Sequence, residues 1–297
     1  MTSSQNPLKL AEILDHTLSF IDLRRDLLTS ALVSRSWVHP SQSRIFASIY
    51  LIGEHGRRLI AVLGTSRHLV DHVLTIRIFN FTTMDPESRR TLAELPFSRV
   101  TDVSIGTDNN DPSLSAAAEL DIRALLRIPS LTDVTAHLKF ESWDSFLRVW
   151  DGCSIAIKHL SLRHSKFDDW EAHKPSDGST APQTRNPIRL KSFDGISCSD
   201  IIAAWLLDPR CPFEVSGLEA FRGSLPVSKL LLPVITESLD TIKILSFSKE
   251  TMQNVPFTWF PNVTEFDIHG PQFAFDFVRD IPDDVRSQIL AVRLQLW

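Results

Sequence analysis

The stretch "VLTIRI", residues 73–78, places apolar side chains at its first, fourth and sixth positions, with Arg77 between the last two. Alternation with a period of two is typical of a strand with one buried face. The same spacing returns at Val100/Val103/Ile105, Leu131/Val134/Ala136, Ile157/Leu160/Leu162, Leu190/Phe193/Gly195, Leu218/Phe221/Gly223, Leu239/Ile242/Ile244, Val263/Phe266/Ile268 and Ile289/Val292/Leu294. The mean separation of about 27 residues indicates internal repeats with one strand each.

Between these strands lie segments with helical spacing, which are "PESRRTLAEL" (86–95), "LDIRALLRI" (120–128), "SWDSFLRVW" (142–150), "SDIIAAWLL" (199–207) and "VSKLLLPVITESL" (227–239). The alternation predicts an α/β fold with parallel strands on one face and helices on the other, each unit covering the apolar edge of the next. A polar stretch at 168–187, rich in Pro, Ser, Thr and Gly, predicts a flexible insert.

Residues 53–297 therefore resemble degenerate leucine-rich repeats, and the resemblance implies a solenoid. Two features depart from that family. The asparagine that usually follows the strand is missing, with Cys198 the single accepted substitute. Glycine takes the third apolar place in two units, at Gly195 and Gly223.

The N-terminal residues predict three short helices. Apolar residues at helical spacing indicate the first over 10–18. Asp22 and Asp26 are good N-cap residues, so we expect a turn at "DLRR" and a second helix from Leu27, and Pro40 suggests the start of a third. The apolar residues of "DLLTSALVSRSW" (26–37) cover more than half of a helix circumference, and so small a unit needs a further neighbour to cover them.

The run "LAEIL", then "DLLTSALVSRSW", then "RIF" resembles the F-box over residues 7–52. The resemblance implies a trihelical module that binds a Skp-family adaptor, and through it a cullin-RING ubiquitin ligase. The adaptor-binding residues that it implies are Leu10, Ala11, Glu12, Ile13, Leu14, Leu27, Leu28, Val33, Arg35 and Trp37. Ala11 stands where many members of the family have proline. The alternative is a helical unit that only caps the repeats.

Residues that alternate with the buried apolar positions point outward together, onto one continuous face of the predicted sheet. Their charges are mixed, so a uniformly acidic or basic target is disfavoured. The predicted target-binding residues on this face are Arg77, His137, His159, Arg163, Asp194, Arg222, Lys243, Glu265, Asp267 and His269, and Asp102, Asp133 and Arg293 share it.

Catalytic motifs are missing from the sequence: it has no nucleophile elbow, phosphate-binding glycine loop or zinc-protease helix. His68 and His72 have the spacing of metal ligands but lack the intervening glutamate, and we interpret them as surface residues. Asp283 and Asp284 are interpreted as helix caps, and Trp143 and Trp150 as core. We therefore predict a protein that is not an enzyme and binds neither cofactor nor metal.

The net charge of -5, without a long basic run, disfavours a nucleic-acid partner. No secretory signal or membrane-length apolar run is present, and three cysteines without a C-x-x-C pair suit a reducing compartment, so we expect a cytoplasmic or nuclear protein away from membranes. The predicted function is substrate recognition for a Skp-cullin-F-box ubiquitin ligase. The alternative is a non-catalytic repeat scaffold unconnected with ubiquitin, and a hydrolase with a new arrangement is a distant third.

Overall fold

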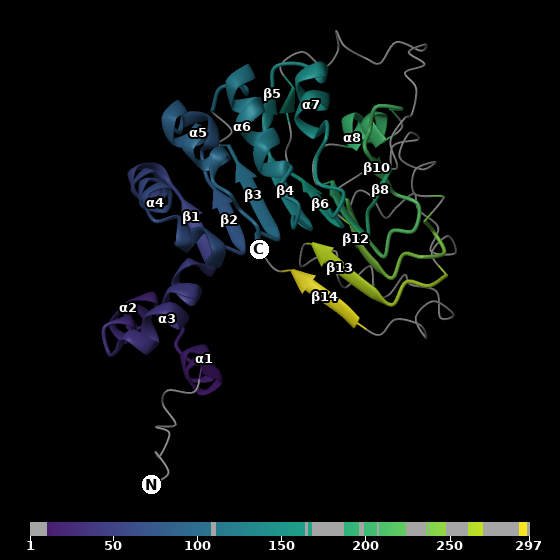
Figure 1. Ribbon diagram of the computed structural model, residues 1–297. Coiled ribbons are helices and arrows are strands. Elements are labelled where there is room, and N and C mark those ends of the chain that lie inside the picture. Colours follow the sequence, from purple (N-terminus) through teal and green to yellow (C-terminus); the bar gives the residue numbers. More distant parts are fainter. Residues whose placement is uncertain are drawn as a thin grey trace.

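The computed structural model describes residues 11–107, 111–163, 166–167, 187–195, 199–206, 208–223, 236, 238–247, 261–269 and 291–295. It confirms an α/β architecture with parallel strands (Figure 1). Among the described residues, ten strands form one sheet in chain order, and the strands of two short two-stranded sheets, β5 with β7 and β8 with β10, lie between them in the sequence. The 168–187 segment, apart from residue 187, lies outside the described residues.

The strands of the main sheet are short and all their pairings are parallel. They are β1 (Ser48–Leu51), β2 (Thr75–Ile78), β3 (Asp102–Gly106), β4 (Asp133–His137), β6 (His159–Leu162), β9 (Ser192–Gly195), β11 (Ala220–Gly223), β12 (Ile244–Phe247), β13 (Glu265–His269) and β14 (Ala291–Gln295). The branch strands are β5 (Lys139–Phe140), β7 (Lys166–Phe167), β8 (Ile188–Arg189) and β10 (Phe213–Glu214).

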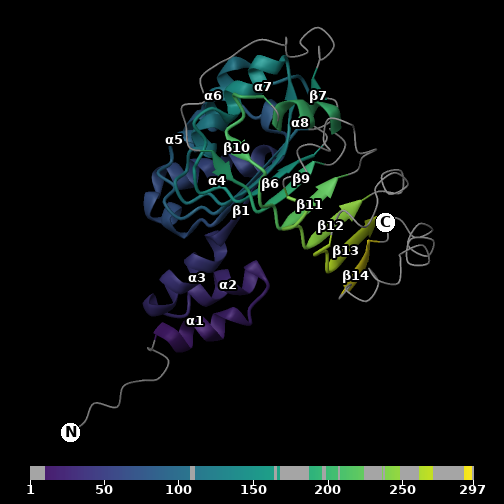
Figure 2. The same ribbon diagram turned by 90° about the vertical axis from the view of Figure 1, so that its right-hand side faces the viewer.

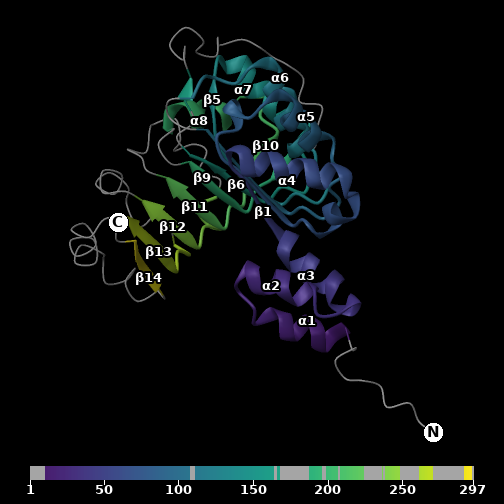
Figure 3. The ribbon, with the colours of Figure 1, turned by 90° about the vertical axis from the view of Figure 1, so that its left-hand side faces the viewer.

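Helices lie between successive strands from β1 to β6 and between β9 and β11, and they cover one face of the sheet (Figures 2 and 3). They are α4 (Gly53–Thr65), η2 (Arg67–His72), η3 (Phe81–Thr83), α5 (Pro86–Glu94), α6 (Ala116–Leu126), α7 (Trp143–Trp150) and α8 (Ser199–Leu206). Side-chain caps start three of them, because Asp85, Ser115 and Ser142 each accept the N–H of the residue three positions on. Four of the predicted helical segments are confirmed; the fifth, 227–239, falls largely outside the described residues.

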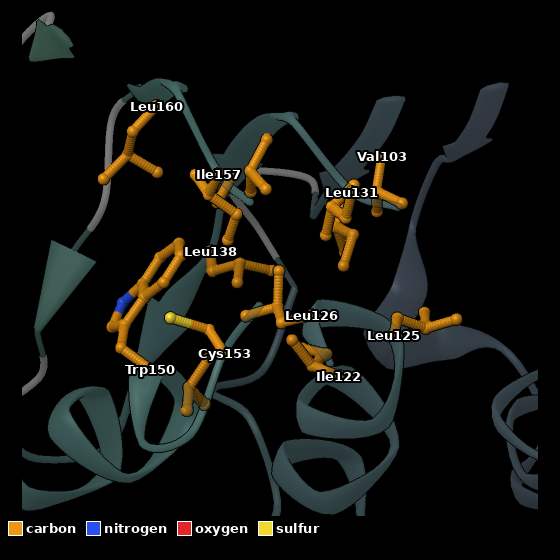
Figure 4. Packing of buried hydrophobic residues seen from close by; sticks show 14 of the residues in the cluster. Val103, Ile122, Leu125, Leu126, Leu131, Leu138, Trp150, Cys153, Ile157 and Leu160 are labelled. Atoms are coloured by element: carbon orange, nitrogen blue, oxygen red, sulfur yellow. The ribbon is translucent and has the colours of Figure 1, made fainter. Parts of the chain in front are cut away.

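One continuous core lies between the sheet and these helices. The strands whose side chains are described direct alternate residues into it, such as Ile76 and Ile78 of β2, which are 0% and 2% exposed. Figure 4 shows Trp150 and Cys153, at the end of α7, beside Leu126 and Leu138 beneath the strands. The predicted apolar positions are therefore the residues that join the two layers.

A ladder of backbone hydrogen bonds also joins the units where the strands begin. The N–H of the residue before each strand donates to the carbonyl of its counterpart one unit earlier, at distances of 2.7 to 3.0 Å. The ladder runs through Ala47, Leu74, Thr101, Thr132, Lys158, Lys191, Glu219, Lys243 and Thr264. These bonds satisfy backbone groups at the edge of the sheet where the strands begin.

Buried carboxylates link the helices. Glu119 of α6, which is 4% exposed, accepts hydrogen bonds from Ser145 Oγ and, at 3.0 Å, from Arg148 Nε of α7. Arg89 of α5 forms an ion pair of 3.4 Å with Asp121 of α6. The side chain of Arg89 is 7% exposed, so this pair is shielded from water. Consecutive helices are therefore joined by polar as well as apolar contacts.

One predicted strand was shifted along the sequence. We expected Leu239/Ile242/Ile244, but β12 pairs Leu245 with Phe221 and Phe247 with Gly223. The correct set is Ile242/Leu245/Phe247. Both triplets satisfy the spacing, and only the pairing with β11 distinguishes them.

The glycine that departs from the repeat pattern has a steric explanation at Gly195. A Cβ there would lie 2.9 Å from Cε1 of Phe193, which is buried two residues earlier. The rings of Phe193 and Phe221 are stacked, with centroids 6.3 Å apart. In this unit the Phe193 ring therefore fills the space that a side chain at position 195 would need.

The N-terminal helices differ in detail from the prediction. They are α1 (Ala11–Ser19), α2 (Arg24–Ala31) and α3 (Arg35–Ala47). Neither Asp22 nor Asp26 is a cap, because α2 begins after Leu23, and Pro40 lies inside α3 instead of starting it. The sheet begins at Ser48, inside the 7–52 range predicted for the helical module, because β1 pairs with β2.

Candidate functional site

The three N-terminal helices enclose a small core of their own. Leu18 of α1, Leu27 of α2 and Ile45 of α3 are buried together, and Trp37 packs against them. Leu14 is 2% exposed. Leu14 and Leu27, predicted to contact an adaptor, therefore hold the module together, and they are not available to a partner without unfolding it.

Large apolar side chains remain exposed on this module, on and around α2. Leu23 and Leu32, at the two ends of that helix, are 66% and 85% exposed. The others are Ile13, Phe20, Leu28 and Val33, with exposures of 40%, 72%, 53% and 65%. We call these six residues the α2 patch. They come from α1, from the turn that follows it, and from α2 and the residues that flank it. Exposed apolar surface of this kind marks interaction sites on soluble proteins.

The α2 patch contains three of the predicted adaptor-binding residues, Ile13, Leu28 and Val33. Glu12 and Arg35 are also exposed, whereas Trp37 is half-buried. Leu10 lies outside the described residues, and Ala11 opens α1. The sequence analysis did not predict Phe20, Leu23 and Leu32 as site residues. Their apolar side chains, in turns between short helices, could have indicated exposed binding residues.

The module is attached to the sheet without a linker, since α3 ends at Ala47 and β1 begins at Ser48. Phe46 packs against both the small core and the main core. His39 of α3 meets His72 of η2 edge to face, with ring centroids 4.9 Å apart. Burial is the main cause that lowers the pKa of His72, and the nearby His39 lowers it further. His72 is thus a junction residue and not the surface residue that we predicted.

The face of the sheet opposite the helices carries most of the predicted target-binding residues whose side chains are described, and the register places the strand residues in rows. Arg77, Asp194, Arg222 and Asp267 share one row with Tyr50, while His159 and Glu265 share another with Asp102 and Asp133. His137 and His159 are half-buried, and Arg163 is exposed. The backbones of Asp267 and His269 lie in β13, and their side chains are outside the described residues.

Two of these residues have roles other than the predicted ones. Asp194 is 5% exposed, and its Oδ2 accepts hydrogen bonds from Ser161 Oγ and Arg163 Nη2, each at 3.0 Å. It holds Arg163 in place. Lys243 precedes β12, in the ladder position of Lys158, Lys191 and Glu219, so it belongs to the edge where strands begin. There Lys191 Nζ lies 3.0 Å from Glu219 Oε1, and this hydrogen bond lowers the pKa of Glu219.

Catalytic or metal-binding groupings are not found among the described residues. No three His, Cys, Asp or Glu side chains there come together as metal ligands. Burial raises the pKa of the Cys211 thiol far above its usual range, so it is not a nucleophile. The arrangement that the described residues offer is one of surfaces for binding.

Comparison with known proteins gives no relative from which to transfer a function. No protein-family model matches the chain, and no curated protein is significantly similar to it. Over the described ranges, no helix is both long enough and apolar enough to cross a bilayer.

Proposed function

We propose that this protein is a substrate-recognition subunit of a Skp-cullin-F-box ubiquitin ligase. In this proposal, α1 to α3 form an F-box that binds a Skp-family adaptor, and the rest of the chain is a leucine-rich-repeat-like solenoid that binds a protein target. The α2 patch is the observation that carries the proposal. It leaves apolar surface uncovered on a module whose sequence resembles the F-box.

Such a subunit acts by bringing its target close to the enzyme that transfers ubiquitin. Holding a target beside a ubiquitin-charged conjugating enzyme raises the effective concentration of the target's lysines, and the subunit supplies no catalytic group. This requires a fixed geometry between adaptor and target. The direct continuation of α3 into β1, with Phe46 in both cores, supplies a firm connection.

Adaptor binding is expected to depend on the α2 patch. Replacing Leu28, Leu32 and Val33 together by glutamate should weaken binding of a purified Skp-family adaptor by at least about tenfold, because burying each aliphatic side chain contributes roughly 1.5 to 3 kcal/mol. Calorimetry on the full chain measures the change. These side chains are exposed, so the module of three helices should stay folded in this variant. Polar changes at the buried residues Leu14 or Leu27 would instead unfold it.

The matched control replaces Leu120 and Ile155 by glutamate. These are also exposed apolar residues, at 62% and 88%, but Leu120 lies in α6 and Ile155 in the turn between α7 and β6, away from the three N-terminal helices in the sequence. Adaptor binding by this variant should equal that of the unchanged chain. Equal binding by the α2-patch variant, or no adaptor binding by the unchanged chain, would refute the proposal.

A second candidate is a repeat scaffold unconnected with ubiquitin, in which the three helices only cap the sheet. The contact of α3 with η2, through His39 and His72, favours this candidate because it covers the first edge of the sheet. It leaves the α2 patch unexplained. Adaptor binding separates the two candidates.

Target capture should depend on the outward face. Replacing the exposed residues Arg77 and Arg163 by alanine should reduce co-purified target by about tenfold, because arginine side chains often carry much of the binding energy of an interface, while leaving adaptor binding unchanged. The control replaces by alanine Lys158 and Lys191, which are also exposed but lie on the edge where strands begin. Quantitative mass spectrometry measures both. Loss of target in the control alone would place recognition on that edge instead.

A further inference from the structure

The outward face carries exposed aromatic and aliphatic side chains at its first two strands. Tyr50, Ile52 and Phe79 are 45%, 51% and 45% exposed. Tyr50 pairs in register with Arg77, and the N–H of Phe79 donates to the carbonyl of Leu51, which places Phe79 beside Ile52. We call Tyr50, Ile52, Arg77 and Phe79 the aromatic patch. Its composition is the one enriched at the centres of protein interfaces.

The Arg77 side chain is positioned over this patch. Its guanidinium carbon lies 5.4 Å from the centroid of the Tyr50 ring, within the range of a cation–π contact. Tyr50 is the single tyrosine of the chain. The contact holds both side chains flat, so the patch is partly ordered before any partner arrives.

Two carboxylates lie next to the aromatic patch on the same face. Asp102 of β3 and Asp133 of β4 are paired in register, an arrangement in which like charges repel. Asp133 accepts a hydrogen bond from Thr132. Among the described residues, Asp102 has no side-chain hydrogen bond and no ion pair, although it is half-buried. Burial raises its pKa, Arg77 lowers it, and Asp133 raises it again.

We propose that this surface binds an extended segment of a partner protein in which an apolar side chain lies about three or four residues from a lysine or arginine. The inference rests on the proposed function and deepens it by naming the class of target segment. The apolar side chain packs on Tyr50 and Phe79, and the basic side chain donates to Asp102. Arg77, Asp102 and Asp133 together carry a net charge of about minus one, which the basic residue neutralises.

The spacing follows from the sheet. Tyr50 and Asp102 are separated by two strand intervals and by two residues along the strands, which corresponds to about 12 Å. An extended chain advances about 3.3 Å per residue, so three or four residues cover that distance. An acidic or phosphorylated segment fits less well, because Asp102 and Asp133 would repel it and Arg163 is already paired with Asp194.

A phage-displayed library of random peptides, selected on the immobilised full chain, tests the proposal. We expect the retained peptides to be enriched in an apolar residue at the stated spacing from lysine or arginine. Synthetic copies should bind about tenfold more weakly to Asp102→Asn and to Tyr50→Ala. They should bind unchanged to Glu87→Gln, which removes an exposed carboxylate from the helical side.

Retained peptides that are acidic, or that show no charge preference, would overturn the inference, as would selection that never exceeds background. Full binding by Asp102→Asn would do the same. Adaptor binding is measured on the same preparations. If the chain binds the adaptor but selects acidic peptides, this inference alone is refuted. If the chain selects apolar-basic peptides but does not bind the adaptor, the proposed function alone is refuted.

Discussion

The Trp150→Ala variant should lose about 3 to 5 kcal/mol of unfolding free energy, the cost of truncating a large core aromatic residue. Trp150 is 0% exposed. Its ring centroid lies 5.6 Å from that of Trp205, 5.8 Å from Phe213 and 6.3 Å from Phe146. It thus joins α7 to α8 and to the β8–β10 branch, and alanine would leave a cavity among three elements. Urea denaturation followed by circular dichroism measures the loss.

The control for this variant is Trp150→Phe. The indole Nε1 of Trp150 is buried without a hydrogen-bond partner, so phenylalanine sacrifices no hydrogen bond and keeps most of the ring. We expect a loss below about 1.5 kcal/mol. In the alanine variant, hydrogen exchange should rise first in the units around α7 and α8, because each unit contacts mainly its neighbours. Equal losses for the two variants, or exchange that rises uniformly, would contradict this explanation.

Gly56→Ala should destabilise the protein by about 1 to 3 kcal/mol, although alanine is the better helix former. A Cβ at Gly56 would lie 2.9 Å from both Cα and the carbonyl carbon of Leu51, which belong to the backbone of β1. Neither atom can move without shifting the strand. Helix α4 would be pushed away from the sheet, and thermal unfolding should shift downward.

Gly64→Ala is the matched control, because both glycines lie in α4. A Cβ at Gly64 meets only Thr91 Cγ2 at 3.5 Å, an ordinary contact. This variant should be more stable than the unchanged chain by roughly 0.5 to 1 kcal/mol. Two substitutions of the same kind in one helix are therefore expected to have opposite signs. Stabilisation by both would show that α4 does not need its close approach to β1.

The sheet could be predicted from the sequence because each strand is short and buries the same alternate positions. The failures occurred where local spacing was ambiguous. Around Ile242 two overlapping triplets satisfy the pattern, and pairing with β11 selects the second. The strand β1 was missed because it follows α3 directly, and α4 because glycine at positions 53 and 56 does not favour a helix.

The candidate adaptor surface could be predicted only in part. Spacing identifies the apolar residues of three short helices, but it does not say which of them face inward. Leu14 and Leu27 are buried by α3, whereas Leu23 and Leu32 are exposed because they lie at the ends of α2. Packing between helices decides this, because apolar residues that cover more than half of a helix circumference mark no single inward face.

The backbone ladder that starts at Ala47 has a consequence for how such a protein can change in evolution. From Ala47 to Thr264, each unit offers a carbonyl acceptor to the next unit and donates its N–H to the one before, so the ladder can close again after a whole strand–helix unit is duplicated or lost. Each such event would alter the distance between the N-terminal module and the later units by one strand interval, about 4.8 Å. The number of units therefore sets the length of the sheet in fixed steps. The junction at Ala47 and Ser48 is the same whatever the number of units.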